Sequence, residues 1–337
     1  MIGISFYLND PSAEERIRDA GSKGVKRGFT SLHLPEEKGE LAAAAKRLLS
    51  AAKESGIDVY ADVSMNTPAH LGVADLFALK DLGVAGLRLD DFFDHHLIVS
   101  LAEEFKIAVN SSILFEEDLK NLLSRGLKPD RLIGWHNFYP RRETGLGESF
   151  FHDQNKLFKG LGIPLAAYIP SRGEKRGPLY EGLPTLEKHR HAEPFAAYAE
   201  LKAAGIDDIY IGDPDIGAGL LEDLLAYEED SVMPLRAENC TLPEGIYATR
   251  PDQARDAVRF MNTRTTDPVP PLNCGKRDAG TITVDNEHYG RYKGEVQITL
   301  SDLPADERVN IAGRIIEEDR PLLSFIKPGQ KIRIIHI

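Results

Sequence analysis

Cysteine and tryptophan are scarce in this sequence, which has two cysteines and one tryptophan among 337 residues. With only Cys240 and Cys274, the chain has no framework of several disulfides such as small secreted domains use. Basic residues are also in the minority, since the sequence has 41 Lys and Arg but 53 Asp and Glu, which gives a net charge of −12. Proteins that bind nucleic acids or anionic membranes usually carry the opposite balance, so both classes are disfavoured. A local basic pocket for a small anion is still compatible with this charge.

Long hydrophobic runs are missing as well. No stretch reaches the roughly 18 uninterrupted apolar residues that a membrane-spanning helix needs. The first residues, MIGISFYLNDPSAEERIRDA, show neither a basic segment followed by an apolar one nor a small-residue cleavage site. We therefore expect a cytoplasmic protein that binds neither membranes nor nucleic acids. The sequence does not indicate its oligomeric state.

Short apolar runs alternate with helical patterns through the first two-thirds of the chain. Candidate strands begin near residues 2, 29, 58, 86, 106, 131, 165 and 208, with amphipathic segments between them. Several of these helices end in a glycine, as a left-handed helix cap requires: Gly24, Gly56, Gly83, Gly126 and Gly205. Eight βα units within about 230 residues favour a (β/α)8 TIM barrel, an α/β fold, over an open doubly wound sheet.

The pattern changes near residue 235, and we expect two domains, a TIM barrel over 1–235 and a small β-barrel over 236–337. The segment 233–253 looks irregular, 255–262 looks like a short helix, and the rest has strand patterns, including 321–326. No glycine-rich dinucleotide fingerprint follows the first strand, and we expect no cofactor. The adjacent His95 and His96 lack the spacing of a helical metal site, so no metal is expected either.

Catalytic groups of a TIM barrel lie at the carboxyl ends of its strands. Alternation along the strands places Tyr60, Asp62, Arg88 and Asp90 inside the barrel. The same rule adds Ser5, Tyr7, His33, Asn110, Ser112 and Ser64. It does not decide between His136 and Asn137, nor does it settle which way Asp213 faces. A structural Arg88–Asp90 ion pair, and Asp62 as a simple loop cap, are alternatives to a catalytic role.

Two connections are unusually long for βα loops, one after residue 136 and one after residue 170. The second combines Gly173 and Gly177 with Arg172, Lys175 and Arg176, and Arg190 follows. Glycine lets the backbone approach a ligand, and arginine offers a planar fork to phosphate or carboxylate. This loop predicts an anionic substrate, although a solvated run of charges would look the same.

Five segments carry a resemblance to a known family. They are SLHLPE (31–36), LRLDD (87–91), HNFYPRRETGLG (136–147), RGPLYEGLPTLEKHR (176–190) and TVDNEHYGRYKGE (283–295). They resemble the MupG-type 6-phospho-N-acetylmuramidases, glycoside hydrolase family 170, over essentially the whole chain. The resemblance implies a TIM barrel followed by a cyclophilin-like β-barrel. It also implies a cytoplasmic enzyme of bacterial cell-wall recycling that cleaves the β-1,4 bond between N-acetylmuramic acid 6-phosphate and N-acetylglucosamine.

The expected site follows from that substrate and from strand position. Glycoside hydrolysis normally uses two carboxyl groups, and we expect Asp62 as the acid and Asp90, held ionised by Arg88, as nucleophile or stabiliser. The alternates are Glu181, Glu187 and Asp213, and the substrate's own acetamido group is another candidate nucleophile. The expected substrate-binding residues are Arg88, Asn110, His136, Asn137, Tyr139, Arg141, Arg172, Arg176 and Arg190, with Arg291 from the second domain.

Two other functions fit the same barrel. A sugar-phosphate lyase or isomerase would need a metal site or an inward lysine, and no lysine lies late on a strand. A non-catalytic sugar-phosphate receptor would have little use for carboxylates at its centre. We therefore expect a glycosidase.

Overall fold

The computed structural model describes residues 1–32, 41–89 and 94–337, which form two compact units, residues 1–221 and 222–337. Eight parallel strands in sequential order close the barrel of the first unit. They are β1 (Ile2–Ser5), β2 (Arg27–Ser31), β3 (Asp58–Val63), β4 (Val84–Leu89), β5 (Lys106–Asn110), β6 (Leu132–Trp135), β7 (Leu165–Ile169) and β8 (Asp208–Ile211). The expected TIM barrel is confirmed.

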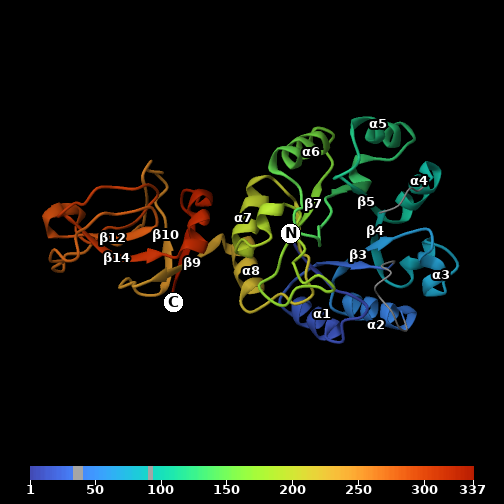
Figure 1. Ribbon diagram of the computed structural model, residues 1–337, viewed down its shortest axis with the longest axis horizontal. Helices are drawn as coiled ribbons and strands as arrows, with labels where there is room; N and C mark the ends of the chain where they lie inside the picture. The colour runs from blue at the N-terminus through green and yellow to red at the C-terminus, as the bar shows by residue number, and fades with distance from the viewer. Residues whose placement is uncertain (33–40, 90–93) are drawn as a thin grey trace. The chain divides into compact units, whose positions relative to one another are not determined.

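Helices cover the outside of this ring of strands (Figure 1). They are α1 (Ala13–Ser22), α2 (Leu41–Glu54), α3 (Thr67–Leu71), α4 (His95–Glu104), α5 (Glu116–Ser124), α6 (Glu148–Gly160) and α7 (Pro194–Ala203). All five glycines expected at helix ends have positive φ, between 70° and 98°. No helix in the described part of the chain is both long and apolar enough to cross a membrane.

Aromatic side chains fill the barrel interior. Trp135 lies 4.3 Å from Tyr210 and 5.5 Å from Tyr60 between ring centroids, and these rings belong to one buried cluster with Tyr7 and Phe29. The inward orientation expected for Tyr60 and Tyr7 is therefore confirmed. Rings of this size need small residues opposite them, because a close-packed interior has no spare volume.

Gly86 is one of these small residues, and its replacement tests the packing. A Cβ atom on Gly86 would lie 2.4 Å from the Tyr60 ring and 3.0 Å from the carbonyl oxygen of Lys106. We expect Gly86→Ala to lower the free energy of unfolding by about 1–3 kcal/mol, as overpacking does. Gly160→Ala is the control, since nothing lies within 4 Å of its added methyl. Equal urea midpoints for both variants would contradict this packing.

The second unit contains a seven-stranded mixed sheet in the order β10-β15-β9-β14-β12-β13-β11. The strands are β9 (Val232–Glu238), β10 (Gly245–Ala248), β11 (Ala257–Arg259), β12 (Thr281–Asp285), β13 (Val296–Thr299), β14 (Val309–Ile315) and β15 (Lys331–His336). An antiparallel bridge between Thr249 and Phe260 links the continuations of the two outermost strands, so the ends of the sheet meet as in a small barrel. Its cyclophilin-like character stays a prediction.

Three local expectations about the second unit were wrong. Residues 255–262 contain β11 rather than a helix, because Val258 and Phe260 are buried in alternation with less buried neighbours. Residues 321–326 contribute to the 3-10 segment η5 (Glu317–Phe325), in which consecutive Leu322 and Leu323 are both buried. The segment expected to be irregular holds β9 and β10. The expected boundary at 235/236 falls inside β9.

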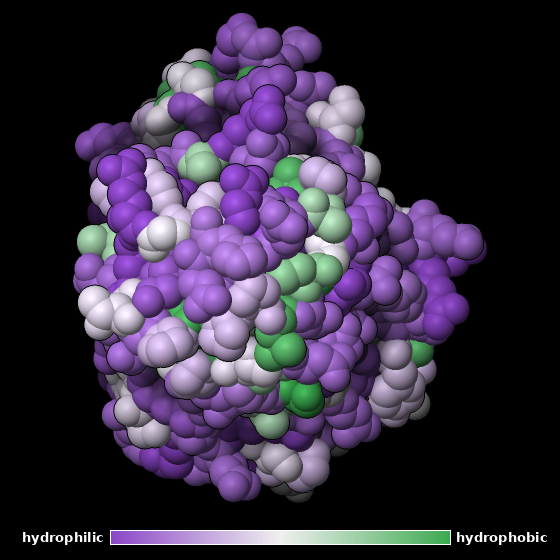
Figure 2. Space-filling view, turned by 90° about the vertical axis from the view of Figure 1, so that its left-hand side faces the viewer, coloured by the Kyte–Doolittle hydropathy of each residue, from purple (hydrophilic) through white to green (hydrophobic). Residues whose placement is uncertain are grey.

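The surface of this unit is largely polar. The face shown in Figure 2, on the side where β12 and β14 lie in Figure 1, is mainly hydrophilic with a narrow hydrophobic strip. Exposed ion pairs such as Arg255–Asp256, at 2.8 Å, recur in this unit. Such pairs contribute little to the free energy of unfolding, so the stability of this unit depends more on its buried groups.

Asp285 is a buried carboxyl that predicts pH-dependent stability. Burial, together with Glu295 and Asp306, raises the pKa of Asp285 to about 7. An acid whose pKa is higher in the folded than in the unfolded protein destabilises the fold as it ionises. The free energy of unfolding should therefore decrease as the pH rises from about 4 to about 7. We expect Asp285→Asn to raise the free energy of unfolding at pH 8 by roughly 2–4 kcal/mol and to change it little at pH 4.

Asp306 has the opposite pH dependence. Arg308 lowers the pKa of Asp306 to about 2, so its stabilising effect is present at neutral pH and is lost as the solution becomes acidic. Asp306→Asn should therefore destabilise the protein at pH 7. Urea titrations over this pH range measure both variants. A stability–pH curve of Asp285→Asn that parallels the wild type would contradict the assignment.

Candidate active site

A buried ion pair lies at the carboxyl ends of β3 and β4. Arg88 Nη1 donates to Asp62 Oδ1 at 2.8 Å, and both side chains are almost fully buried. Arg88 Nη2 also donates to the side-chain oxygen of Asn137, which follows β6. A guanidinium contact stabilises the ionised form of a carboxyl group. Asp62, expected to be the acid, therefore has a cation beside it that favours its ionised form. Asp90, the expected partner of Arg88, lies outside the described residues, as does His33.

Tyr139 and Ser112 extend this polar group. The half-buried phenol of Tyr139 is hydrogen-bonded to Ser112 and lies near Arg88, and burial raises its pKa. Ser112 Oγ accepts the backbone N–H of Asn137 at 3.1 Å. Asn110 uses its side-chain oxygen locally, accepting the backbone N–H of Ser112 at 3.0 Å. The ends of β3 and β4 and the loops after β5 and β6 thus meet around Arg88. We name Asp62, Arg88, Ser112, Asn137 and Tyr139 the mouth cluster.

The His136 side chain lies between Ser112 and α6, with Nδ1 3.4 Å from Ser112 Oγ. Its ring is fully buried, contacts Asn155 through Nε2 at 2.8 Å, and packs on Phe151 at 4.7 Å between centroids. Asn155 and Phe151 both belong to α6. Burial lowers the pKa of His136 to about 4, so the ring is neutral at physiological pH. Of the two residues that the sequence left undecided, Asn137 belongs to the mouth cluster, while His136 lies behind it and joins Ser112 to α6.

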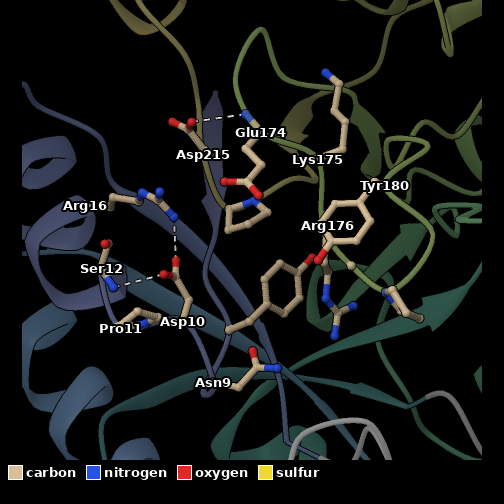
Figure 3. Close-up of a pocket in the computed structure, with 14 residues that line it drawn as sticks. Asn9, Asp10, Pro11, Ser12, Arg16, Glu174, Lys175, Arg176, Tyr180 and Asp215 are labelled. Atoms are coloured by element: carbon tan, nitrogen blue, oxygen red, sulfur yellow. Dashed lines mark hydrogen bonds and ion pairs between the residues drawn. The ribbon is translucent and has the colours of Figure 1, made fainter.

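A cavity of about 520 Å³ opens beside β1, β7 and β8 (Figure 3). In Figure 3 Arg176 and Tyr180 extend from the loop after β7 toward the segment that carries Asn9 and Asp10, while Lys175 points away from them. The lining residues are Tyr7, Asn9, Asp10, Pro11, Ser12, Arg16, Glu174, Lys175, Arg176, Gly177, Pro178, Tyr180, Pro214 and Asp215. Its volume lies in the range typical of small-molecule sites.

Of the arginines that the sequence predicted to bind substrate, Arg176 lines this cavity. Its guanidinium lies 3.7 Å from the centre of the Tyr7 ring, within cation–π range. Arg172 instead donates to Glu193 at 2.6 Å. Arg141 is exposed to solvent, and Arg291, in the second unit, packs 4.9 Å from the ring of Tyr292. Arg176 is therefore the predicted arginine that lies on the wall of the cavity, together with Arg16.

Arg190 and Glu187 form a structural clamp between the two long loops. Arg190 donates to both carboxylate oxygens of Glu187, at 2.7 and 2.6 Å, and to the backbone carbonyl of Arg141 at 3.0 Å. Glu187 also accepts the backbone N–H groups of Glu143 and Gly145. These contacts lower its pKa to about 2, which makes it a poor proton donor.

The other alternate carboxyls also have structural partners. Glu181 forms an ion pair with Arg142 on the neighbouring loop. Asp213 follows β8, is fully buried, and accepts backbone N–H groups of Ser171 and Arg176 at 3.1 and 3.0 Å. Burial raises the pKa of Asp213. It does not line the cavity described above.

Polar residues from the loop after β1, from α1 and from the loop after β8 also line the cavity and were not predicted from the sequence. Asp10 and Arg16 form an ion pair at 2.6 Å, and Asp215 accepts the backbone N–H of Glu174 at 3.1 Å. The polar turn that directly follows the first strand was the available signal. Within the described residues, no group of three or more His, Cys, Asp or Glu could hold a metal ion.

Solved structures similar to this chain are known, and they support its fold. Two solved structures match almost the whole chain. One, a conserved protein of unknown function from Enterococcus faecalis, is 34% identical with a TM-score of 0.90, covering 100% of this chain and 96% of that one. The other, an uncharacterised B. cereus protein, is 29% identical with a TM-score of 0.77, covering 99% of both chains. No curated protein matches.

Family models give the assignment. The model of the 6-phospho-N-acetylmuramidase N-terminal domain matches residues 2–226, and that of the C-terminal domain matches residues 230–335. The first match corresponds to the barrel and the second to the mixed-sheet unit. The members of this family are glycosidases. The chain therefore belongs to the 6-phospho-N-acetylmuramidase family.

Proposed function

We propose that this protein hydrolyses the β-1,4 bond between N-acetylmuramic acid 6-phosphate and N-acetylglucosamine, in the cytoplasm, during recycling of bacterial cell wall. Membership of the family over both units is the observation that carries the proposal. The site chemistry supports it, since a buried carboxylate and several hydrogen-bonding groups lie at the barrel mouth, and a cavity lined by arginine lies beside β1, β7 and β8.

Asp62 takes the role of the ionised carboxylate in this proposal. Hydrolysis of a glycoside needs one carboxyl that stays ionised and one that delivers a proton to the leaving oxygen. The 2.8 Å contact with Arg88 favours the anionic form of Asp62. The roles expected from the sequence are therefore exchanged, and Asp90 becomes the proposed acid. The anionic Asp62 either attacks the anomeric carbon or orients the acetamido group that does so.

The remaining groups of the site bind the sugar. The substrate carries two anions, a phosphate and a lactyl carboxylate, for which arginine forks are the fitting partners. Arg176, on the wall of the cavity, is proposed to bind the phosphate. Asn137 and Asn110 are proposed to bind the acetamido group or hydroxyls, and Tyr139 to stack under a ring.

Isotope labelling of the products tests the reaction class. The phosphorylated disaccharide is incubated with the protein in water enriched in oxygen-18, and the products are analysed by mass spectrometry. Hydrolysis at the anomeric carbon places one heavy oxygen on N-acetylmuramic acid 6-phosphate and none on N-acetylglucosamine. Unlabelled, dehydrated sugar phosphate would indicate a lyase, and an unchanged disaccharide would indicate a receptor.

A further inference from the structure

Two consecutive residues at the end of β8, Gly212 and Asp213, hold both partners of the Arg176–Tyr7 stack. The Tyr7 hydroxyl donates to the carbonyl oxygen of Gly212 at 2.7 Å. The backbone N–H of Arg176 donates to Asp213 Oδ1 at 3.0 Å. The ring of Tyr7 and the backbone of Arg176, whose guanidinium lies 3.7 Å from the ring centre, are thus anchored to two neighbouring residues.

Asp213 also fixes the rest of the loop after β7. Its Oδ2 accepts the backbone N–H of Ser171 at 3.1 Å, and it accepts a further backbone bond from Leu183. The ammonium group of Lys175 lies 4.0 Å from the same oxygen. One carboxylate therefore binds the beginning, middle and end of the loop 171–183. A loop of this length would otherwise sample many conformations, each placing the Arg176 side chain differently.

The surroundings of Asp213 suit a positioning role and not a reactive one. Its side chain is fully buried, and the cavity is lined by its neighbours Pro214 and Asp215 instead. Gly212 has no room for a side chain, since a Cβ atom would lie 2.7 Å from the backbone oxygen of Leu183. The loop thus packs directly against the backbone that carries Asp213.

We infer that Asp213 is a positioning residue for anion recognition: by holding the loop 171–183, it sets the Arg176 guanidinium against Tyr7 for the phosphate of the substrate. The identity of the anion as a sugar 6-phosphate rests on the proposed function. In this arrangement Asp213 takes no proton from the substrate and makes no contact with it. Its effect is therefore on binding of the phosphorylated substrate, not on bond cleavage.

Kinetics of Asp213→Asn test this inference. We expect KM for the phosphorylated substrate to rise about tenfold, the factor that loss of a hydrogen bond to a charged group gives, with kcat within about threefold of wild type. The unphosphorylated substrate should show no such change. Asp207→Asn is the matched control, because Asp207 accepts the backbone N–H of Leu165 at the opposite end of β7, at 2.8 Å. The control should keep the wild-type preference for the phosphate.

Tyr7→Phe extends the test if Asp213→Asn does not fold. It removes the bond to Gly212 and keeps the ring, and we expect a several-fold loss of phosphate preference. Binding of N-acetylmuramic acid 6-phosphate and of the unphosphorylated sugar, measured by calorimetry, gives a readout without catalysis. Unchanged preference in the variants would overturn the inference, as would a fall in kcat with KM unchanged. Wild-type protein that prefers the phosphorylated sugar but cleaves nothing would overturn the proposed function alone.

Discussion

Asp62→Asn is expected to lower kcat by roughly 10²–10⁴-fold while the protein stays folded. Asparagine has the same shape as aspartate and keeps an oxygen for the guanidinium of Arg88, which now donates to Asp62 at 2.8 Å. It lacks the negative charge that the oxocarbenium-like transition state requires. Steady-state kinetics on the phosphorylated disaccharide, with thermal unfolding of the same samples, measure both effects.

Asp58→Asn is the control for this variant. Asp58 stands at the start of the same strand, β3, and its exposed carboxylate forms an ion pair with Arg27. Surface pairs contribute little, so this change should leave both kcat and stability close to wild type. A folded Asp62→Asn variant that turns over within threefold of wild type would remove Asp62 from the chemistry.

Arg88→Met should produce the largest loss of stability, about 3–5 kcal/mol at pH 7. The substitution keeps much of the side-chain volume but leaves the Asp62 carboxylate, 4% exposed, without its guanidinium partner. An ionised group in such a place is costly when its counter-charge is removed. The effect should shrink at low pH, where Asp62 can take up a proton. Urea unfolding at pH 5 and pH 8 measures it.

The double variant Arg88→Met/Asp62→Asn separates charge from packing. Because it removes both charges, most of the lost stability should return. The coupling free energy between Arg88 and Asp62 should then be well above the deviation from additivity expected for independent sites. A double variant as unstable as the sum of the two single changes would mean that Arg88 stabilises the barrel through packing and not through Asp62.

The barrel could be predicted well from the sequence, because the spacing of apolar residues along helices and strands is a direct consequence of backbone geometry. Alternation in β3 and β4 put Asp62 and Arg88 inside, and both are there, in contact with each other. Alternation could not predict which side chain points inward after β6, because the strand ends at Trp135 and the next two residues no longer follow the pleat. His136 and Asn137 consequently could be separated only by their contacts.

The roles of the arginines were harder to predict for a different reason. A guanidinium binds a phosphate and a backbone carbonyl with the same donors, so composition alone does not distinguish Arg176 from Arg190. Only the fold shows that Arg190 binds Glu187 and three carbonyl groups, and that Arg176 lines the cavity. The same holds for Glu187 and Asp213, whose carboxylates bind backbone N–H groups.

The most direct test of a phosphate-selective glycosidase is hydrolysis of a chromogenic β-N-acetylmuramide with and without the 6-phosphate, at neutral pH, with EDTA present. We predict rapid release of the chromophore from the phosphorylated compound and a far smaller kcat/KM for the unphosphorylated one, with no effect of EDTA. Equal cleavage of the two compounds would contradict a phosphate-selective site, and cleavage of neither would contradict the glycosidase.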